Sequence, residues 1–201
     1  RDRIGKKPFV YADLKDKFIF ASEIPAVLKG MNSDNELNYS AVASIFLHNM
    51  RHIPDPYTAY KEVKRLRPGH AIIVKDGILE KEWRFWEPTL SPLQPTPSNL
   101  LGLLEESVKI RMRSDVPVGA LLSGGIDSSA IVAIMKKFSE EKIHTYALGY
   151  NELDEDIIRA RQMSKYLDTK HKEYFFDSDD QWQIYNKLIA VYGEPIALLP
   201  L

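Results

Sequence analysis

The chain has 201 residues, of which 44% are hydrophobic and 27% charged, and its net charge is −1. These values favour a folded protein over a disordered one, and they give no global basic field that would attract nucleic acid. Because the chain has no cysteine, a disulfide scaffold, a thiolate zinc site and a cysteine nucleophile are excluded within it. It shows no membrane-length apolar run and no secretory leader, so we expect a cytoplasmic protein.

Residues 1–87 form a first block, which we predict to be an α+β segment. Ser22 is placed to cap a short helix that Gly30 ends, and Asp76–Gly77 is a strong signal for a two-residue hairpin turn. The predicted strands and helices are Phe9–Ala12, Phe18–Ala21, Ile24–Leu28 (helix), Tyr39–His48 (helix), Ala71–Val74 and Leu79–Phe85.

A linker is predicted at residues 88–98, because four of the twelve prolines lie between Glu87 and Ser98. Strand and helix patterns then alternate through residues 99–201, which implies a parallel sheet of the doubly wound α/β class. The predicted elements of this second block are Asn99–Met112 (helix), Val118–Leu122, a helix ending near Phe138, His144–Leu148, Glu155–Leu167 (helix), Lys172–Phe176 and Asp180–Tyr192 (helix).

The main candidate binding site is the segment in which the predicted strand Val118–Leu122 is followed by Ser123-Gly124-Gly125 and then by a helix that begins near Asp127. Glycines allow a sharp turn and a close approach of the backbone to a ligand. The amides and the dipole at the start of a helix attract anions, usually phosphate. Serine hydroxyls add hydrogen-bond donors, and the Asp127 carboxylate is a candidate to hold Mg²⁺ against the phosphates.

The structural alternative for this loop is a tight strand-to-helix turn with a serine cap. The other phosphate and nucleophile motifs fail: the sequence has no GxxxxGK[ST], no GxGxxG after a strand, and no GxSxG around Ser123. Strand, SGGIDSS and helix in an alternating chain therefore favour phosphate binding.

The run Ser123–Ser128 resembles the SGGxDS loop of the PP-loop ATP pyrophosphatases. The resemblance implies that the loop binds the pyrophosphate of ATP and that Asp127 acts on Mg²⁺ through the phosphates. It also implies that Leu148, at the end of the next strand, contacts adenine, although a core leucine is the alternative. The implied ATP-binding residues are Leu122, Ser123, Gly124, Gly125, Asp127, Ser128, Ser129 and Leu148.

The flanking segments resemble the glutamine-hydrolysing asparagine synthetases. Residues 1–9, RDRIGKKPF, are similar to the RDxxGxxPLYY segment of class II glutamine amidotransferase domains, and residues 63–70 to the V+RLPPGH segment near the end of that domain. Further similarities are FASEI at 20–24, YALG at 146–149, LDTKH at 167–171 and YGEP at 192–195. This order implies the C-terminal part of an amidotransferase domain (1–87), a linker (88–98) and the N-terminal part of a synthetase domain (99–201).

The resemblance implies a carbon–nitrogen ligase that amidates aspartate to asparagine through an acyl-adenylate, with ATP, Mg²⁺ and ammonia from glutamine. It further implies small-molecule partners, a candidate homodimer, and neither nucleic acid nor membrane as a partner. The family's glutaminase cysteine and its SGxGSDE motif are absent from the 201 residues. We therefore expect these 201 residues, on their own, to bind ATP without turnover.

Two alternatives stay open at this point. One is a non-catalytic fragment that binds ATP or pyrophosphate, and the other is a relative that amidates another carboxylate, as β-lactam synthetases or polysaccharide-modifying enzymes do. Gly193 stands where the family usually has Asp, and leucines occupy positions 198 and 199, which keeps the acceptor open. Glu194 is a candidate for contact with substrate or metal, with a turn residue as the alternative.

Overall fold

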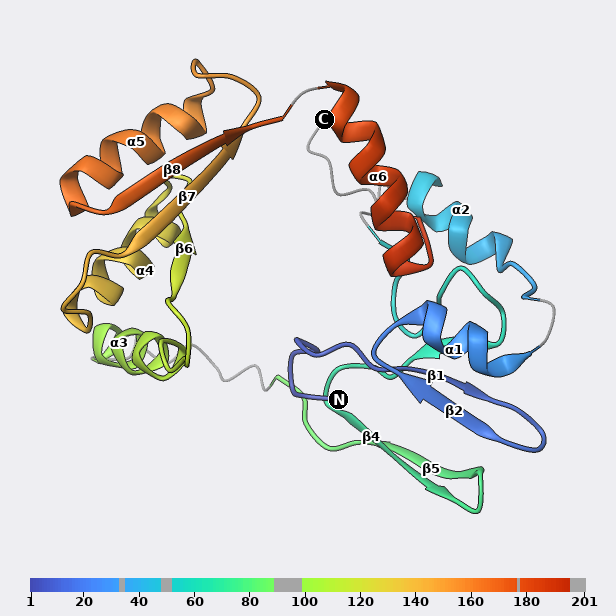
Figure 1. Cartoon of the computed structure of the whole chain (residues 1–201). Coiled ribbons are helices and arrows are strands. Elements are labelled where there is room, and N and C mark those ends of the chain that lie inside the picture. The colour runs from blue at the N-terminus through green and yellow to red at the C-terminus, as the bar shows by residue number, and fades with distance from the viewer. Residues whose placement is uncertain (33–34, 48–51, 89–98, 177, 196–201) are drawn as a thin grey trace. The chain divides into compact units, whose positions relative to one another are not determined.

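The computed structural model describes residues 1–32, 35–47, 52–88, 99–176 and 178–195. The chain divides into two compact units, unit 1 from Arg1–Leu90 and the chain from Gln183 onward, and unit 2 from Ser91–Trp182. The elements (Figure 1) are β1 Val10–Asp13, β2 Phe18–Ala21, α1 Ile24–Met31, α2 Tyr39–Leu47, β3 Val63–Arg65, β4 His70–Lys75, β5 Ile78–Arg84, α3 Leu100–Arg111, β6 Gly119–Leu121, α4 Ile126–Lys137, β7 His144–Gly149, α5 Glu155–Leu167, β8 Lys170–Phe175 and α6 Ser178–Tyr192.

Unit 1 is built on an antiparallel sheet with the strand order β2-β1-β3. Helix α1 packs against this sheet, and the core between them contains buried side chains from both layers. The core residues are Val10, Ala12, Ile24, Val27, Met31 and Val63. This packing of a helix on an antiparallel sheet is the α+β structure predicted for the first block.

The hairpin of β4 and β5 has the turn that the sequence predicts. Asp76 and Gly77 both have positive φ, at 52° and 80°, as a two-residue turn that matches the right-handed twist of its strands requires. The strands pair antiparallel from His70 opposite Arg84 to Lys75 opposite Ile78.

Three details of unit 1 differ from the sequence prediction. The cap of α1 is Glu23 and not Ser22, and it makes no side-chain capping bond. The helix continues through Gly30 and ends at Asn32, which takes the left-handed conformation because an asparagine tolerates it well. Strand β3 was not predicted, because three residues are too few for a periodic pattern, and His48 lies outside the described residues.

Unit 2 contains a parallel sheet, as predicted, and its strand order is β6-β7-β8. Helices α4 and α5 connect its strands and contact each other, and α5 runs along β7 and β8 (Figure 1). The strand order does not reverse among the described strands, so this sheet corresponds to one half of the expected doubly wound arrangement. The buried core residues are Val108, Leu122, Val132, Ile134, Met135, Ile143, Ala147, Ile157, Ala160 and Leu167.

The first compact segment ends at Leu90, and the linker at residues 88–98 stays a prediction because most of it lies outside the described residues. The chain from Gln183 onward, however, groups with unit 1 and not with the block that precedes it in sequence. Among the described residues, no helix has both the length and the apolar character needed to cross a membrane.

Candidate functional site

The glycine-rich loop leaves the carboxyl end of β6, the edge where open parallel sheets bind their ligands. The side chain of Leu122 is buried, and its backbone N–H donates to the carbonyl of Tyr146 on β7 at 2.8 Å. Residues 123–125 then turn away from the sheet, and α4 begins at Ile126. Burial of Leu122 therefore anchors the loop, while the residues after it are free to face a ligand.

The two glycines of the loop differ in how much space surrounds them. Gly124 has a φ of +74°, and a Cβ at this position would lie 2.4 Å from the carbonyl carbon of Arg159 on α5. Gly125 is the N-cap of α4 with an ordinary φ of −69°, and a Cβ there would have Ser123 Oγ as its nearest neighbour, at 3.6 Å. Gly124 is thus demanded by the fold, whereas the described residues leave room for a side chain at 125.

Hydroxyls and a carboxylate surround the start of α4. The Oγ atoms of Ser123 and Ser128 lie 3.1 Å apart, and Ser128 Oγ also donates to the Gly125 carbonyl at 3.2 Å. Asp127 is exposed in the first turn, and Gly125 supplies no side-chain cap. An anion bound here would therefore meet helix amides that no capping side chain occupies.

Ser129 differs from the other serines of the loop. Its side chain is buried, and its Oγ has no hydrogen-bond partner among the described residues. Its backbone N–H donates to the Gly125 carbonyl at 3.0 Å as part of the helix. The Ser129 hydroxyl, for which the sequence predicts a phosphate contact, is therefore buried in the protein.

A cavity of about 180 Å³ opens beside the loop at the carboxyl ends of β6 and β7. Leu148 is half exposed and lines this cavity, as do Leu122 and Ser123. The structure thus brings the predicted adenine contact together with the predicted phosphate loop. Asp156, which the sequence analysis did not select, lines the same cavity with an exposed carboxylate.

From the sequence, Asp156 is explained by the helix dipole, as acids at the start of a helix usually are, and no role in a site is predicted for it. The cap of α5 is in fact Asp154, whose carboxylate accepts a hydrogen bond from the Asp156 N–H at 3.0 Å. Asp154 therefore serves as the cap, and the exposed Asp156 carboxylate lies 3.9 Å from Arg159 Nη1. Its position after the end of β7 is the signal that could have identified it.

A buried polar network crosses β7 and β8 in unit 2. Thr145 Oγ1 lies 2.7 Å from Thr169 Oγ1 and 2.9 Å from His171 Nδ1. The carboxylate of Glu173 lies 3.8 Å from His171 Nε2 and accepts two hydrogen bonds from Arg161, at 2.8 and 2.7 Å. Burial lowers the pKa of His171, and the Arg161 guanidinium lowers the pKa of Glu173.

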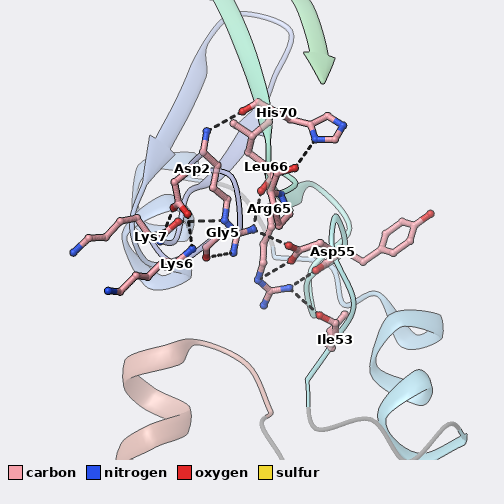
Figure 2. Close-up of polar contacts among 12 residues, drawn as sticks. Asp2, Gly5, Lys6, Lys7, Ile53, Asp55, Arg65, Leu66 and His70 are labelled. Atoms are coloured by element: carbon pink, nitrogen blue, oxygen red, sulfur yellow. Dashed lines mark hydrogen bonds and ion pairs between the residues drawn. The ribbon is translucent and has the colours of Figure 1, made fainter. Parts of the chain in front are cut away.

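A second polar cluster organises unit 1 around its N-terminal segment. Arg1 Nη1 donates to Asp55 at 2.7 Å and to the Leu66 carbonyl at 2.7 Å. The Asp2 carboxylate accepts hydrogen bonds from the backbone N–H groups of Lys6 and Lys7, both at 2.9 Å, and these bonds lower its pKa. Figure 2 shows the cluster, with Arg65 also directed toward Asp55.

Glu194 belongs to this cluster in unit 1 and not to the compact unit that holds the glycine-rich loop. Its buried carboxylate forms an ion pair with Arg65 and accepts a hydrogen bond from the Ala59 N–H at 3.2 Å. A cavity of about 660 Å³ adjoins the pair and is lined by Arg1, Ser22, Asp55 and other residues of unit 1. The described residues contain no group of three or more acidic or histidine side chains arranged for a metal.

Comparison with known proteins identifies both blocks. The family model described as asparagine synthase matches residues 99–198, and the glutamine amidotransferase domain model matches residues 1–86. The chain belongs to the family of glutamine-hydrolysing asparagine synthetases. The segment with the SGGxDS loop and the segment that resembles an amidotransferase domain are thus both features of this one family.

Relatives in this family match the chain over most of its length. A Methanocaldococcus jannaschii protein assigned as asparagine synthetase [glutamine-hydrolyzing] 2 is 36% identical over 97% of the chain and 39% of its own length. Asparagine synthetase [glutamine-hydrolyzing] 3 of Bacillus subtilis is 36% identical over 77% of the chain and 26% of its length, and synthetase 1 of the same organism is 28% identical over 98% and 31%. The chain therefore spans less than half the length of these relatives.

The fold accounts for the glycine at position 193. Gly193 has a φ of +75°, and a Cβ at this position would lie 2.9 Å from Pro25 and 3.0 Å from Ile24 on α1. Packing against α1 and the left-handed conformation thus explain the glycine without reference to a substrate. Leu198 and Leu199 lie outside the described residues.

Proposed function

We propose that the complete protein amidates aspartate to asparagine, using ATP and ammonia taken from glutamine. The observation that carries this proposal is the juxtaposition of the uncapped Gly125 helix start with the Leu148 cavity at one edge of the parallel sheet. Such an edge suits a nucleotide whose phosphates lie on the loop and whose base contacts Leu148. Because the chain belongs to this family, we infer that ATP bound in this geometry reacts to form an acyl-adenylate.

In the proposed reaction, a carboxylate oxygen of aspartate attacks the α-phosphorus of ATP, and pyrophosphate leaves. Backbone amides at the start of α4, with the hydroxyls of Ser123 and Ser128, stabilise the charge that develops on the leaving pyrophosphate. Ammonia then attacks the carbonyl carbon of the acyl-adenylate, AMP leaves, and the amide of asparagine remains. Glutamine hydrolysis in the amidotransferase domain supplies the ammonia and releases glutamate.

The carboxylates near the loop are suitable ligands for Mg²⁺, which prefers a few carboxylates together with phosphate oxygens. Asp127 in the first turn of α4 would hold the ion through the phosphates, and the exposed carboxylate of Asp156 in the adjoining cavity is a second candidate. Bound Mg²⁺ would neutralise phosphate charge as it builds up on the leaving group.

The proposal is tested with the complete protein, ATP, Mg²⁺ and aspartate, by measuring AMP and asparagine with ammonium chloride or glutamine as nitrogen source. We expect one AMP for each asparagine with either source. AMP that forms only with another carboxylate would favour the relatives that amidate other acids. Binding of ATP without AMP formation under all these conditions would favour the non-catalytic alternative.

A further inference from the structure

One buried ion pair joins the two family segments inside unit 1. Glu194 lies in the segment matched by the asparagine synthase model, and Arg65 lies in the segment matched by the amidotransferase model. The side chain of Glu194 is 4% exposed and that of Arg65 is 16% exposed. Because the pair is shielded from water, its attraction is screened far less than that of a surface pair.

Arg65 is held from several sides. Its Nη1 atom donates to the carbonyls of Ile53, at 3.3 Å, and Tyr57, and its Nε atom lies 3.9 Å from Asp55. Asp55 is paired in turn with Arg1, so two guanidinium groups alternate with two carboxylates. The Glu194 carboxylate completes this alternation, and without it the partly buried Arg65 would lose one of its two counter-charges.

The turn before Glu194 is shaped for the same contact. Helix α6 ends at Tyr192, and the N–H of Gly193 donates to the Ile189 carbonyl at 2.8 Å in a left-handed helix end. Only a residue without a Cβ avoids both the backbone strain and the contacts with Pro25 and Ile24. This steric observation is independent of the ion pair, and both bring the end of α6 against the amidotransferase segment.

Helix α6 starts at Ser178, shortly after β8 ends at Phe175, and β8 pairs with β7, which bears Leu148. In the chain, the turn at 193–194 therefore follows the strands of the candidate nucleotide site. We propose that the Gly193–Glu194 turn and Arg65 are positioning residues, which hold the end of the synthetase segment on the amidotransferase segment so that glutamine-derived ammonia is used for amidation. This inference rests on the proposed function.

The experiment compares Arg65→Gln and Gly193→Ala with the unsubstituted complete protein. Three quantities are measured: asparagine formed with ammonium chloride, asparagine formed with glutamine, and glutamate released. Lys61→Gln is the matched control, because it removes the partner of Glu36 in an ion pair of unit 1 whose side chains are 52% and 68% exposed.

In both test variants we expect ammonia-supported synthesis to stay within roughly two-fold, and glutamine-supported synthesis to fall by roughly five-fold or more. Glutamate released per asparagine should rise correspondingly, a change in stoichiometry that simple loss of folded enzyme does not produce. The Lys61→Gln control should keep the unsubstituted ratio.

An unchanged ratio in both variants, or an equal loss of all three activities in both, would overturn the inference, because the turn would then act only through folding. No asparagine from ammonium chloride in the unsubstituted protein would instead overturn the proposed function, and this inference with it.

Discussion

The backbone of Gly124 lies so close to α5 that a methyl group at position 124 would sit 2.4 Å from the carbonyl carbon of Arg159 and 2.6 Å from the backbone nitrogen of Ala160. The contact joins the glycine-rich loop to the helix that begins beside Asp156. The close approach of loop and helix therefore restricts the shape of the loop, and Asp156 near the start of the same helix lines the adjoining cavity.

We predict that alanine at the two loop glycines affects different properties, namely stability at position 124 and ATP binding at position 125. Gly124→Ala should destabilise the protein by about 2 kcal/mol or more, because strain at a positive φ adds to the clash with α5. Gly125→Ala should change stability by less than about 0.5 kcal/mol yet weaken ATP binding, since the methyl group would occupy space left for phosphate. Urea unfolding and ATP titration measure the two effects, and equal ATP affinity of Gly125→Ala and the unsubstituted protein would contradict the second.

Leu148→Ala should lower the affinity for ATP by roughly five-fold, because about 1 kcal/mol of apolar contact with the base would be lost. Pyrophosphate binding should be unchanged, since pyrophosphate has no base. Leu153→Ala is the control, as its side chain is 83% exposed and it does not line the cavity. If both substitutions weakened ATP binding equally, Leu148 would have no specific role.

Asp127→Asn should weaken the Mg²⁺-dependent part of ATP binding by roughly ten-fold while leaving the fold intact, because the exposed carboxylate is lost at nearly constant shape. Calorimetric titration of ATP with and without Mg²⁺ separates the two contributions. Asp115→Asn makes the same chemical change at another exposed position and should have no effect. Unchanged Mg²⁺ dependence in Asp127→Asn would remove this residue from the site.

Acid should destabilise the protein through His171. Burial holds the pKa of His171 below its ordinary value of 6.5, so the unfolded chain binds a proton more readily than the folded one. The contribution of His171 to stability is therefore fully present above pH 6.5 and decreases as the pH falls toward the lowered pKa. Glu173, whose pKa is also lowered, adds a further loss below its ordinary value of 4.5.

Unfolding by urea at pH 7.0 and 5.5 tests this dependence. His171→Asn should flatten the change between these pH values, because the titrating ring is removed while a polar group remains near Thr145. His52→Asn, at an exposed position of unit 1, should retain it. An identical pH dependence in His171→Asn and the unsubstituted protein would show that the loss of stability has another origin.

The local features of this protein can be predicted from its sequence. Alternating strand and helix patterns predicted the parallel sheet, and Asp76–Gly77 predicted the β4–β5 turn, since both depend on neighbours along the chain. The glycine-rich loop could be located and related to its family because its residues are contiguous. Leu148 could be paired with the loop because parallel strands end at a common edge.

Contacts between residues that are far apart in the sequence emerge from the three-dimensional fold. It showed that Gly124 is required by α5 while Gly125 is not, that the Ser129 hydroxyl is buried, and that Asp156 lines the cavity. It also joined Glu194 to Arg65 and explained Gly193 by its contact with α1. Such relations depend on packing between distant segments, and a single sequence carries no periodic signal for a contact of that kind.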